Sequence, residues 1–127
     1  MMTYMAARRD KRIKKILVAS SICDMFKAYE ERGDVQSALC ACIGGSPEEM
    51  PEEYEKISSL YWADEIKIPL LLIHSKGDTK ANFDTQAQPI YDKLKDSTAC
   101  TFIIHDDDHH GFREEDIPKI IDWLENK

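Results

Sequence analysis

Two polar segments of this sequence carry side chains that could perform acid–base chemistry. Asp78 follows a short apolar run and the turn residues Lys76-Gly77, and a cluster of histidines and aspartates occupies residues 105–110. A carboxylate and an imidazole that it orients are two members of a nucleophile–base–acid triad. The carboxylate holds the imidazole in the tautomer that accepts the nucleophile's proton. The acid lies 32 residues before His110, which matches the chain order nucleophile, acid, base. The alternative is that Gly77-Asp78 only forms a turn, since both residue types are common there.

The nucleophile of such a triad is not found in the sequence. It is expected in a Gly-x-Ser-x-Gly turn between a strand and a helix. Ser20 and Ser21 follow an apolar run, but no flanking glycine would let the backbone turn sharply, so neither is expected to be the nucleophile. None of the glycines brackets a serine in this way: Gly33, Gly44, Gly45, Gly77 and Gly111.

A metal site is the rival interpretation of the cluster at 105–110. Its histidines and aspartates are suitable ligands. Neighbouring residues of one loop rarely converge on a single ion without ligands from elsewhere, so we expect neither a metal nor another cofactor. His105 and His109 are instead expected to be solvated loop residues, and His74, at a strand end, a hydrogen-bonded structural histidine.

Three short apolar runs predict the strands that position these residues. The run Ile68–Ile73 indicates a strand buried on both faces. The runs Lys15–Ser20 and Ala99–Ile104 indicate two more, the latter rich in β-forming residues. Chemistry in open α/β sheets occurs beyond the carboxyl ends of the strands. Asp78 and His110 both follow such ends, so their side chains are expected at the same edge of the sheet.

Helical periodicity fills the segments between these strands. The predicted helices extend from Met1 to about Arg9, from the cap Asp24 to Gly33, from Asp34 to Ile43 before Gly44, from the capping box Ser46–Glu49 or Pro51 to Tyr61, from Phe83 to Leu94, and from Glu114 to Glu125. The last helix is expected to turn one apolar face toward the core: Ile117, Ile120, Ile121 and Leu124. This alternation predicts an α/β fold of three layers, α/β/α, with about three parallel strands and a helical insertion at residues 24–63.

The whole chain resembles the C-terminal part of a prolyl-oligopeptidase-type serine peptidase, like the dipeptidyl and acylaminoacyl peptidases, with the α/β-hydrolase fold. Segment 68–78 resembles the family's acid segment, and Asp107–Phe112 resembles the base segment, in which the His before Gly-Phe is catalytic. The resemblance therefore implies Asp78 as the triad acid and His110 as the base. The sequence departs from the family pattern where it has His109 in place of Gly, and Lys80-Ala81-Asn82 where Arg-Val-Pro is frequent.

The resemblance also implies what this chain does not contain. Residues Met1–Tyr4 resemble the helix directly after the nucleophile turn, so the chain is expected to begin just after the missing serine. It would then be a truncated serine peptidase that acts on peptide substrates only together with the missing N-terminal half of the domain. The alternative is a non-catalytic α/β domain. The strand Ile16–Ala19 would expose an unpaired apolar edge, through which the chain would self-associate or bind a partner.

The composition bounds the class of protein and its compartment. A net charge of −7 argues against a nucleic-acid partner, and the basic run at 8–15 is expected to be a solvated helix end and turn. No apolar run approaches the roughly 20 residues that span a bilayer, and no export signal is present. The cysteines lack the spacing of a zinc site or a redox pair. We expect reduced, mostly buried thiols in a cytoplasmic protein: Cys23, Cys40, Cys42 and Cys100.

Overall fold

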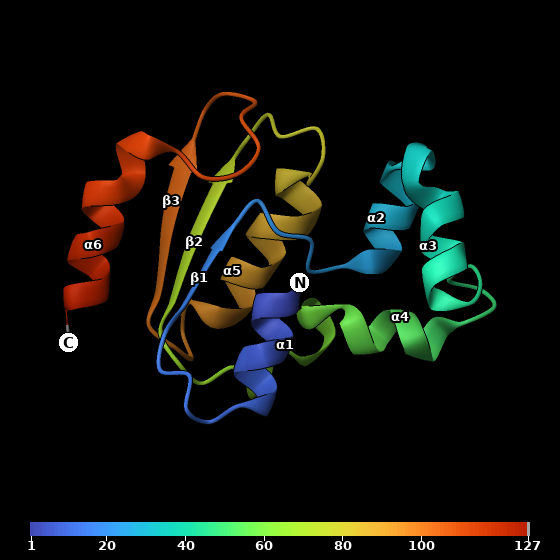
Figure 1. Ribbon diagram of the computed structural model, residues 1–127, viewed down its shortest axis with the longest axis horizontal. Coiled ribbons are helices and arrows are strands. Elements are labelled where there is room, and N and C mark those ends of the chain that lie inside the picture. Colours follow the sequence, from blue (N-terminus) through green and yellow to red (C-terminus); the bar gives the residue numbers. More distant parts are fainter. Residues whose placement is uncertain (127) are drawn as a thin grey trace.

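The architecture is a three-stranded parallel sheet with helices on both of its sides (Figure 1). The computed structural model describes residues 1–126. Its longer helices and strands are, in chain order, α1 (Met2–Arg9), β1 (Ile16–Ala19), α2 (Met25–Glu31), α3 (Gln36–Ile43), α4 (Pro51–Ile57), β2 (Leu70–Ser75), α5 (Gln88–Leu94), β3 (Cys100–His105) and α6 (Ile117–Glu125). Shorter helical turns cover Gly33–Val35, Ser59–Glu65, Phe83–Ala87 and Glu114–Asp116. Helices α1 and α5 lie on one side of the sheet and α6 on the other, which confirms the predicted three-layer α/β fold.

Strand β2 occupies the centre of the sheet, between β1 and β3. All of its residues are buried. Both neighbours run parallel to it, with Leu72 opposite Val18 on one side and Phe102 on the other. A strand that is covered on both faces needs no polar alternation, which explains its continuous apolar run. The parallel arrangement brings the carboxyl ends of β2 and β3 to one edge, where the loops with Asp78 and His110 begin.

The main hydrophobic core lies between the sheet and the side that carries α1 and α5. Tyr4 of α1, Trp62 of the Ser59–Glu65 turns and Leu94 of α5 are buried there. Each large apolar side chain buried in this way contributes about 1.5–3 kcal/mol, so this layer holds the strands firmly beneath the site. The buried members are Tyr4, Ile16, Val18, Cys23, Trp62, Ala63, Ile66, Leu70, Leu72, Ile90 and Leu94.

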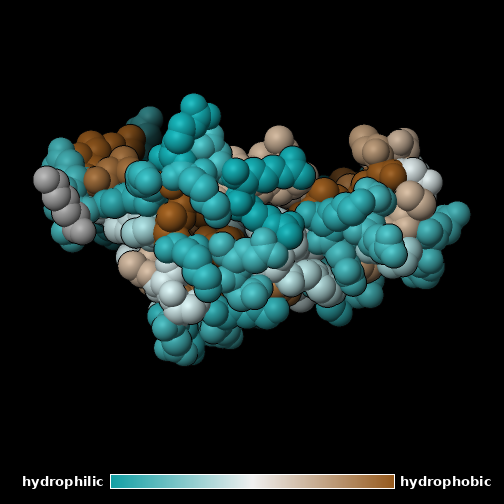
Figure 2. Space-filling model, turned by 90° about the horizontal axis from the view of Figure 1, so that it is seen from below, coloured by the Kyte–Doolittle hydropathy of each residue, from teal (hydrophilic) through white to brown (hydrophobic). Residues whose placement is uncertain are grey.

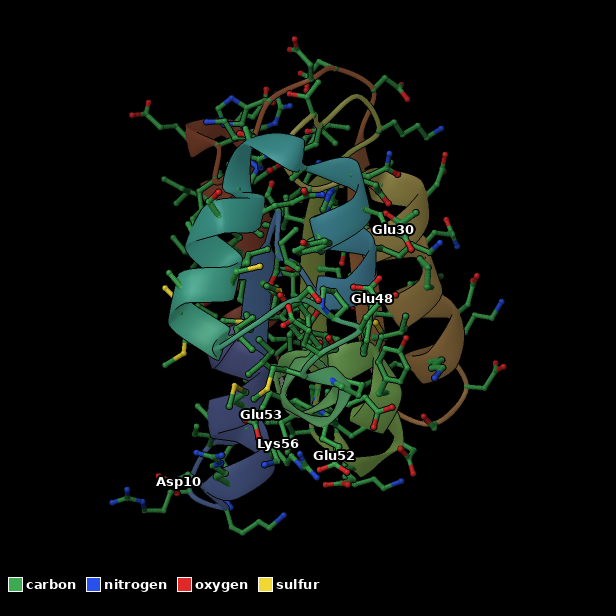
Figure 3. All side chains as sticks on the ribbon, turned by 90° about the vertical axis from the view of Figure 1, so that its right-hand side faces the viewer. Asp10, Glu30, Glu48, Glu52, Glu53 and Lys56 are labelled. Carbon is green, nitrogen blue, oxygen red and sulfur yellow. The ribbon has the colours of Figure 1, made fainter. Side chains whose placement is uncertain are left out.

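Helices α2, α3 and α4 lie together at the end of the molecule that is farthest from α6 (Figure 1). They enclose a small core of their own around Met25, Ala28 and Tyr54. The predicted cap of α2 is confirmed, because the Asp24 carboxylate accepts the N–H groups of Phe26 at 3.0 Å and of Lys27 at 3.2 Å. Figure 3 views the molecule from this end and shows acidic side chains gathered there: Glu30, Glu48, Glu52 and Glu53.

The capping box at Ser46 forms, but it closes a turn and not a helix. The Glu49 N–H donates to Ser46 Oγ at 3.3 Å, and the Ser46 N–H donates to Glu49 Oε1 at 3.0 Å. Helix α4 begins only at Pro51, whose missing N–H suits the first helical position. Gly44 ends α3 with φ 111°, as predicted. Gly33 does not end α2, because that helix already closes at Arg32.

The helix predicted from Phe83 to Leu94 is present, but its first turn is wider than an α-helix. Residues Phe83–Ala87 are wound as a π-helix, in which the Gln88 N–H donates to the Phe83 carbonyl. The wide turn lies directly before Pro89, which has no N–H and whose ring crowds the preceding turn. The apolar side chains Ala87, Ile90 and Leu94 are buried, and Tyr91 is partly buried, so the helix turns one apolar face inward.

The prediction that α6 turns its apolar face into a core is wrong. Ile117 and Ile121 are each 48% exposed and Leu124 is 53% exposed. Figure 2 shows this hydrophobic face at the end of the molecule that carries α6. Periodicity predicts that one face of a helix is apolar, but it does not supply a second element to cover that face.

The cysteines are free thiols, and most of them are not buried as predicted. Only Cys23 is fully buried, whereas Cys42 is exposed and the other two are partly buried. Burial raises the pKa of the Cys23 thiol to about 12 and that of Cys100 to about 11, so these two are poor nucleophiles near neutral pH. Within residues 1–126, no helix is both long enough and apolar enough to cross a membrane.

Candidate active site

Asp78 sits in a tight turn directly after β2 and is almost completely buried. One carboxylate oxygen, Oδ1, accepts the backbone N–H groups of Lys80 at 2.8 Å and Ala81 at 2.9 Å. Burial by itself would raise the pKa of this carboxyl, but the hydrogen bonds from Ala81, His110 and Lys80 outweigh it, and the net pKa lies below the ordinary value. Asp78 is therefore an ionised carboxylate with one oxygen, Oδ2, still available.

His110 occupies that remaining oxygen. Its Nδ1 lies 2.8 Å from Asp78 Oδ2. Because an ionised carboxylate only accepts hydrogen bonds, Nδ1 carries a proton, and in the neutral imidazole Nε2 is then the nitrogen with the lone pair. The imidazole is 40% exposed while the Asp78 side chain is fully buried, so the free nitrogen can be reached from outside. The structure thus brings together the two predicted site residues in the arrangement of an acid that orients a base.

The backbone around His110 is anchored to β1 by a contact that the sequence did not predict. The Gly111 N–H donates to Ser20 Oγ at 2.8 Å. Gly111 has φ 103° and Ser20, just after β1, has φ 51°, which is a costly conformation for a serine. No sequence signal marks Ser20 for this role, because residues with positive φ are usually glycine or asparagine.

Neither candidate serine approaches the base as a nucleophile would. The Ser20 hydroxyl is buried and accepts the Gly111 N–H. The Ser21 hydroxyl accepts from the N-terminal ammonium of Met1 at 2.6 Å and donates to the Ile22 carbonyl at 3.3 Å. Within residues 1–126, no hydrogen bond joins a serine hydroxyl to His110.

The other histidines separate into three environments. His74 is buried and its Nε2 lies 2.7 Å from the Ala81 carbonyl, which confirms a structural role. His109 is exposed and contacts the Phe112 carbonyl at 2.9 Å. The prediction that His105 is solvated is wrong, since its Nε2 lies 2.8 Å from the buried carboxylate of Asp116. Among the described residues, no three His, Cys, Asp or Glu side chains gather closely enough to hold a metal ion.

A cavity of about 380 Å³ opens beside the acid. It lies between the Asp78 turn and helix α2, and most of its lining residues are polar or charged. Charged side chains of both signs contribute to it. The lining residues are Ile22, Ala28, Glu31, Arg32, Asp78, Thr79, Lys80, Asn82 and Gln86. A small molecule or a substrate side chain in this cavity would lie next to the turn that carries Asp78.

Comparisons with known proteins place the chain in a family. The profile described as "Prolyl oligopeptidase family" matches residues 1–127. The chain is 34% identical over 74 residues to "Uncharacterized peptidase YtmA" of Bacillus subtilis (strain 168), a match that covers 58% of this chain and 28% of that protein.

Solved structures resemble the chain over nearly its full length. A structure titled as acylaminoacyl peptidase in complex with Z-Gly-Gly-Phe-chloromethyl ketone superposes with a TM-score of 0.82 and 26% identity, over 99% of this chain and 22% of that one. Acylaminoacyl peptidase from Pyrococcus horikoshii gives a TM-score of 0.73 and 29% identity, over 91% of this chain and 18% of that one. The chain spans less than a third of the length of each of these relatives.

Proposed function

Because the chain belongs to the prolyl oligopeptidase family, we propose that it supplies the acid and the base of a serine peptidase. The observation that carries this proposal is the 2.8 Å contact between Asp78 Oδ2 and His110 Nδ1, which leaves Nε2 free at the surface. An oriented, accessible imidazole next to a buried ionised carboxylate is what a base-assisted nucleophile requires.

In this mechanism His110 Nε2 takes the proton of a serine hydroxyl as that oxygen attacks the carbonyl carbon of the substrate. Asp78 stabilises the imidazolium that results, and His110 then gives the proton to the leaving amine. We propose that the serine belongs to a segment outside these 127 residues, since neither Ser20 nor Ser21 is placed for attack. The amide N–H after that serine would contribute to the oxyanion site.

The substrate class follows from the relatives. One neighbour is titled as an acylaminoacyl peptidase with a bound Z-Gly-Gly-Phe-chloromethyl ketone, and another, from Mycobacterium tuberculosis, as a puromycin-hydrolyzing peptidase. We propose that the present site cleaves amide bonds of short peptides. The cavity between Asp78 and α2 would receive one of the substrate's side chains.

A fluorophosphonate probe tests this proposal directly. We expect the purified 127-residue chain to remain unlabelled, because the nucleophile is elsewhere. The protein captured from its native cells by an antibody against residues 1–127 should be labelled at a single serine of another segment and should hydrolyse peptide amides. Labelling of the purified chain at Ser20 or Ser21 would contradict the external nucleophile.

Two histidine variants supply a matched comparison in the native protein. His110→Gln should reduce peptide hydrolysis by about 10²–10⁴-fold, the usual contribution of a general base. His109→Gln should retain activity, because that neighbouring side chain is exposed and contacts only a backbone carbonyl. Equal activity of the two variants would refute the role of His110.

A second candidate function is association without catalysis, and the free edge of the sheet favours it. Within residues 1–126, strand β1 pairs with β2 alone. A hollow of about 400 Å³ lies along the strand, lined in part by Met2, Leu17 and Phe112. Met2 and Phe112 are 72% and 61% exposed. An unpaired strand edge with apolar neighbours is a place where another strand can add to the sheet.

A further inference from the structure

We infer that Arg113 is a positioning residue for His110, because it fixes the loop that carries the base to the strand that precedes the acid. The inference deepens the proposed function and rests on it, since the placement of the imidazole matters for catalysis only if His110 is the base. Arg113 lies three residues after His110 and acts through other side chains.

The first contact of Arg113 closes the base loop. Its Nη2 donates to Asp107 Oδ1, which also accepts the His109 N–H at 3.1 Å. His110 lies between the two ends of this closed loop. The Arg113 side chain is only 14% exposed, whereas the Asp107 side chain is 51% exposed, so the guanidinium is shielded from water while the carboxylate remains half open to it.

The second contact joins the loop to β2. Arg113 Nη2 also donates to Ser75 Oγ at 3.1 Å. Ser75 is the last residue of β2, and its carbonyl accepts the Asp78 N–H at 3.2 Å. The Gly77 N–H donates to the Asp107 carbonyl at 2.9 Å. Asp107 contacts the turn with the acid through its backbone carbonyl, and Arg113 contacts the end of β2 through its guanidinium. Together these contacts hold the loop that carries His110 to the turn that carries Asp78.

The sequence around Arg113 offers no second cation on the same loop, and the nearby Lys76 pairs with the exposed Asp106 at 3.6 Å. Arg113 is the sole arginine or lysine between Lys95 and Lys119, while Asp106, Asp107, Asp108, Glu114, Glu115 and Asp116 are all acidic. The hydrogen bond from the Arg113 guanidinium holds the pKa of Asp107 at about 2. Without this cation the three aspartates beside His110 would repel one another, and the loop would open.

The hydrogen bond between His110 and Asp78 can be observed without any assay of activity. In the purified chain labelled with ¹⁵N-histidine, NMR measures how fast the Nδ1 proton of His110 exchanges with water. Arg113→Met should raise this rate at least about tenfold, as expected when a hydrogen bond to a charged group weakens. Arg113→Lys should give an intermediate rate, because lysine restores the charge but not the rigid planar guanidinium that directs these hydrogen bonds.

Two further variants keep the test decisive. Arg12→Met removes an exposed arginine that also pairs with an aspartate, Asp10 at 2.7 Å, and should leave the exchange rate unchanged. If Arg113→Met fails to fold by circular dichroism, Ser75→Ala removes only the link to β2 and should still raise the rate. An unchanged exchange rate in a folded Arg113→Met variant overturns the inference. If Arg113→Met does not fold, an unchanged exchange rate in Ser75→Ala overturns it.

Failure of this inference and failure of the proposed function are distinguishable. If His110→Gln leaves peptide hydrolysis intact while Arg113→Met accelerates exchange, the proposed peptidase role is wrong and the structural link stands. If His110 is essential but Arg113→Met leaves exchange unchanged, only the positioning role is wrong.

Discussion

At the scale of single residues, the site depends on contacts that residue types do not specify. The sequence identified Asp78 and His110 by their order and their family resemblance, and the structure places them 2.8 Å apart. It did not identify Ser20 or Arg113, because a serine with positive φ and an arginine among acids look ordinary in a sequence. Their roles arise only when the loops after β1, β2 and β3 meet.

The Asp107–Arg113 pair predicts how stability responds to acid. Its hydrogen bond with Arg113 holds the pKa of Asp107 at about 2, against an ordinary value of 3.8. Because the pKa is lower in the folded state, the ionised carboxylate stabilises the fold. This contribution is complete at pH values above the ordinary pKa, and it is lost as the pH falls from about 4 to about 2. In urea unfolding, the free energy of unfolding of the wild type should therefore exceed that of Asp107→Asn, and this difference should decrease as the pH falls through this range.

A neighbouring carboxylate provides the control for that measurement. Asp106 is 93% exposed and lies 3.6 Å from Lys76, so Asp106→Asn should change the free energy of unfolding by less than about 0.5 kcal/mol at any pH. A pH-independent difference between wild type and Asp107→Asn would show that the pair does not form in solution.

At the scale of elements, the approach of the acid and base loops requires a glycine. A Cβ atom at Gly77 would lie 2.9 Å from the carbonyl oxygen of Asp107, so an alanine there must push the two loops apart. The sequence predicted both loops from strand ends, but their mutual distance follows from the packing of β2 against β3.

Alanine substitution at two glycines tests this crowding. Gly77→Ala should destabilise the chain by about 1–3 kcal/mol, because either the backbone or the pair with Arg113 must shift. Gly33→Ala should be neutral or stabilising by up to about 1 kcal/mol, since nothing lies within 4 Å of a Cβ at that position. The two free energies are measured by denaturant unfolding, and equal values would show that the loops approach less closely than in the structure.

At the scale of the whole molecule, two apolar surfaces have no covering element among the described residues. One is the exposed face of α6, with Ile117, Ile121 and Leu124, and the other is the free edge of β1. Contiguous apolar surface of this kind favours association. The sequence predicted the unpaired β1 edge but wrongly placed the α6 face inside a core.

These surfaces predict that the isolated chain self-associates as its concentration rises. Ile121→Lys places a charge in the α6 face, where the native side chain is 48% exposed, and should weaken association by about tenfold or more while leaving the fold intact. Lys119→Gln, on an exposed position of the same helix, is the control. Size-exclusion chromatography with light scattering measures the outcome, and a wild-type monomer at all concentrations would contradict the prediction.

The sequence by itself determined the fold class and the order of the strands and helices, and it singled out Asp78 and His110 as the proposed acid and base. The fold class follows from local periodicity and capping residues, and the two site residues follow from motif order and the family resemblance, all of which are read from neighbouring residues. Only the tertiary structure decided which groups hold His110 in place, that His105 pairs with Asp116, and that α6 leaves its apolar face open. Each of these depends on contacts between residues far apart in the chain or on the absence of a covering neighbour, which no local pattern records.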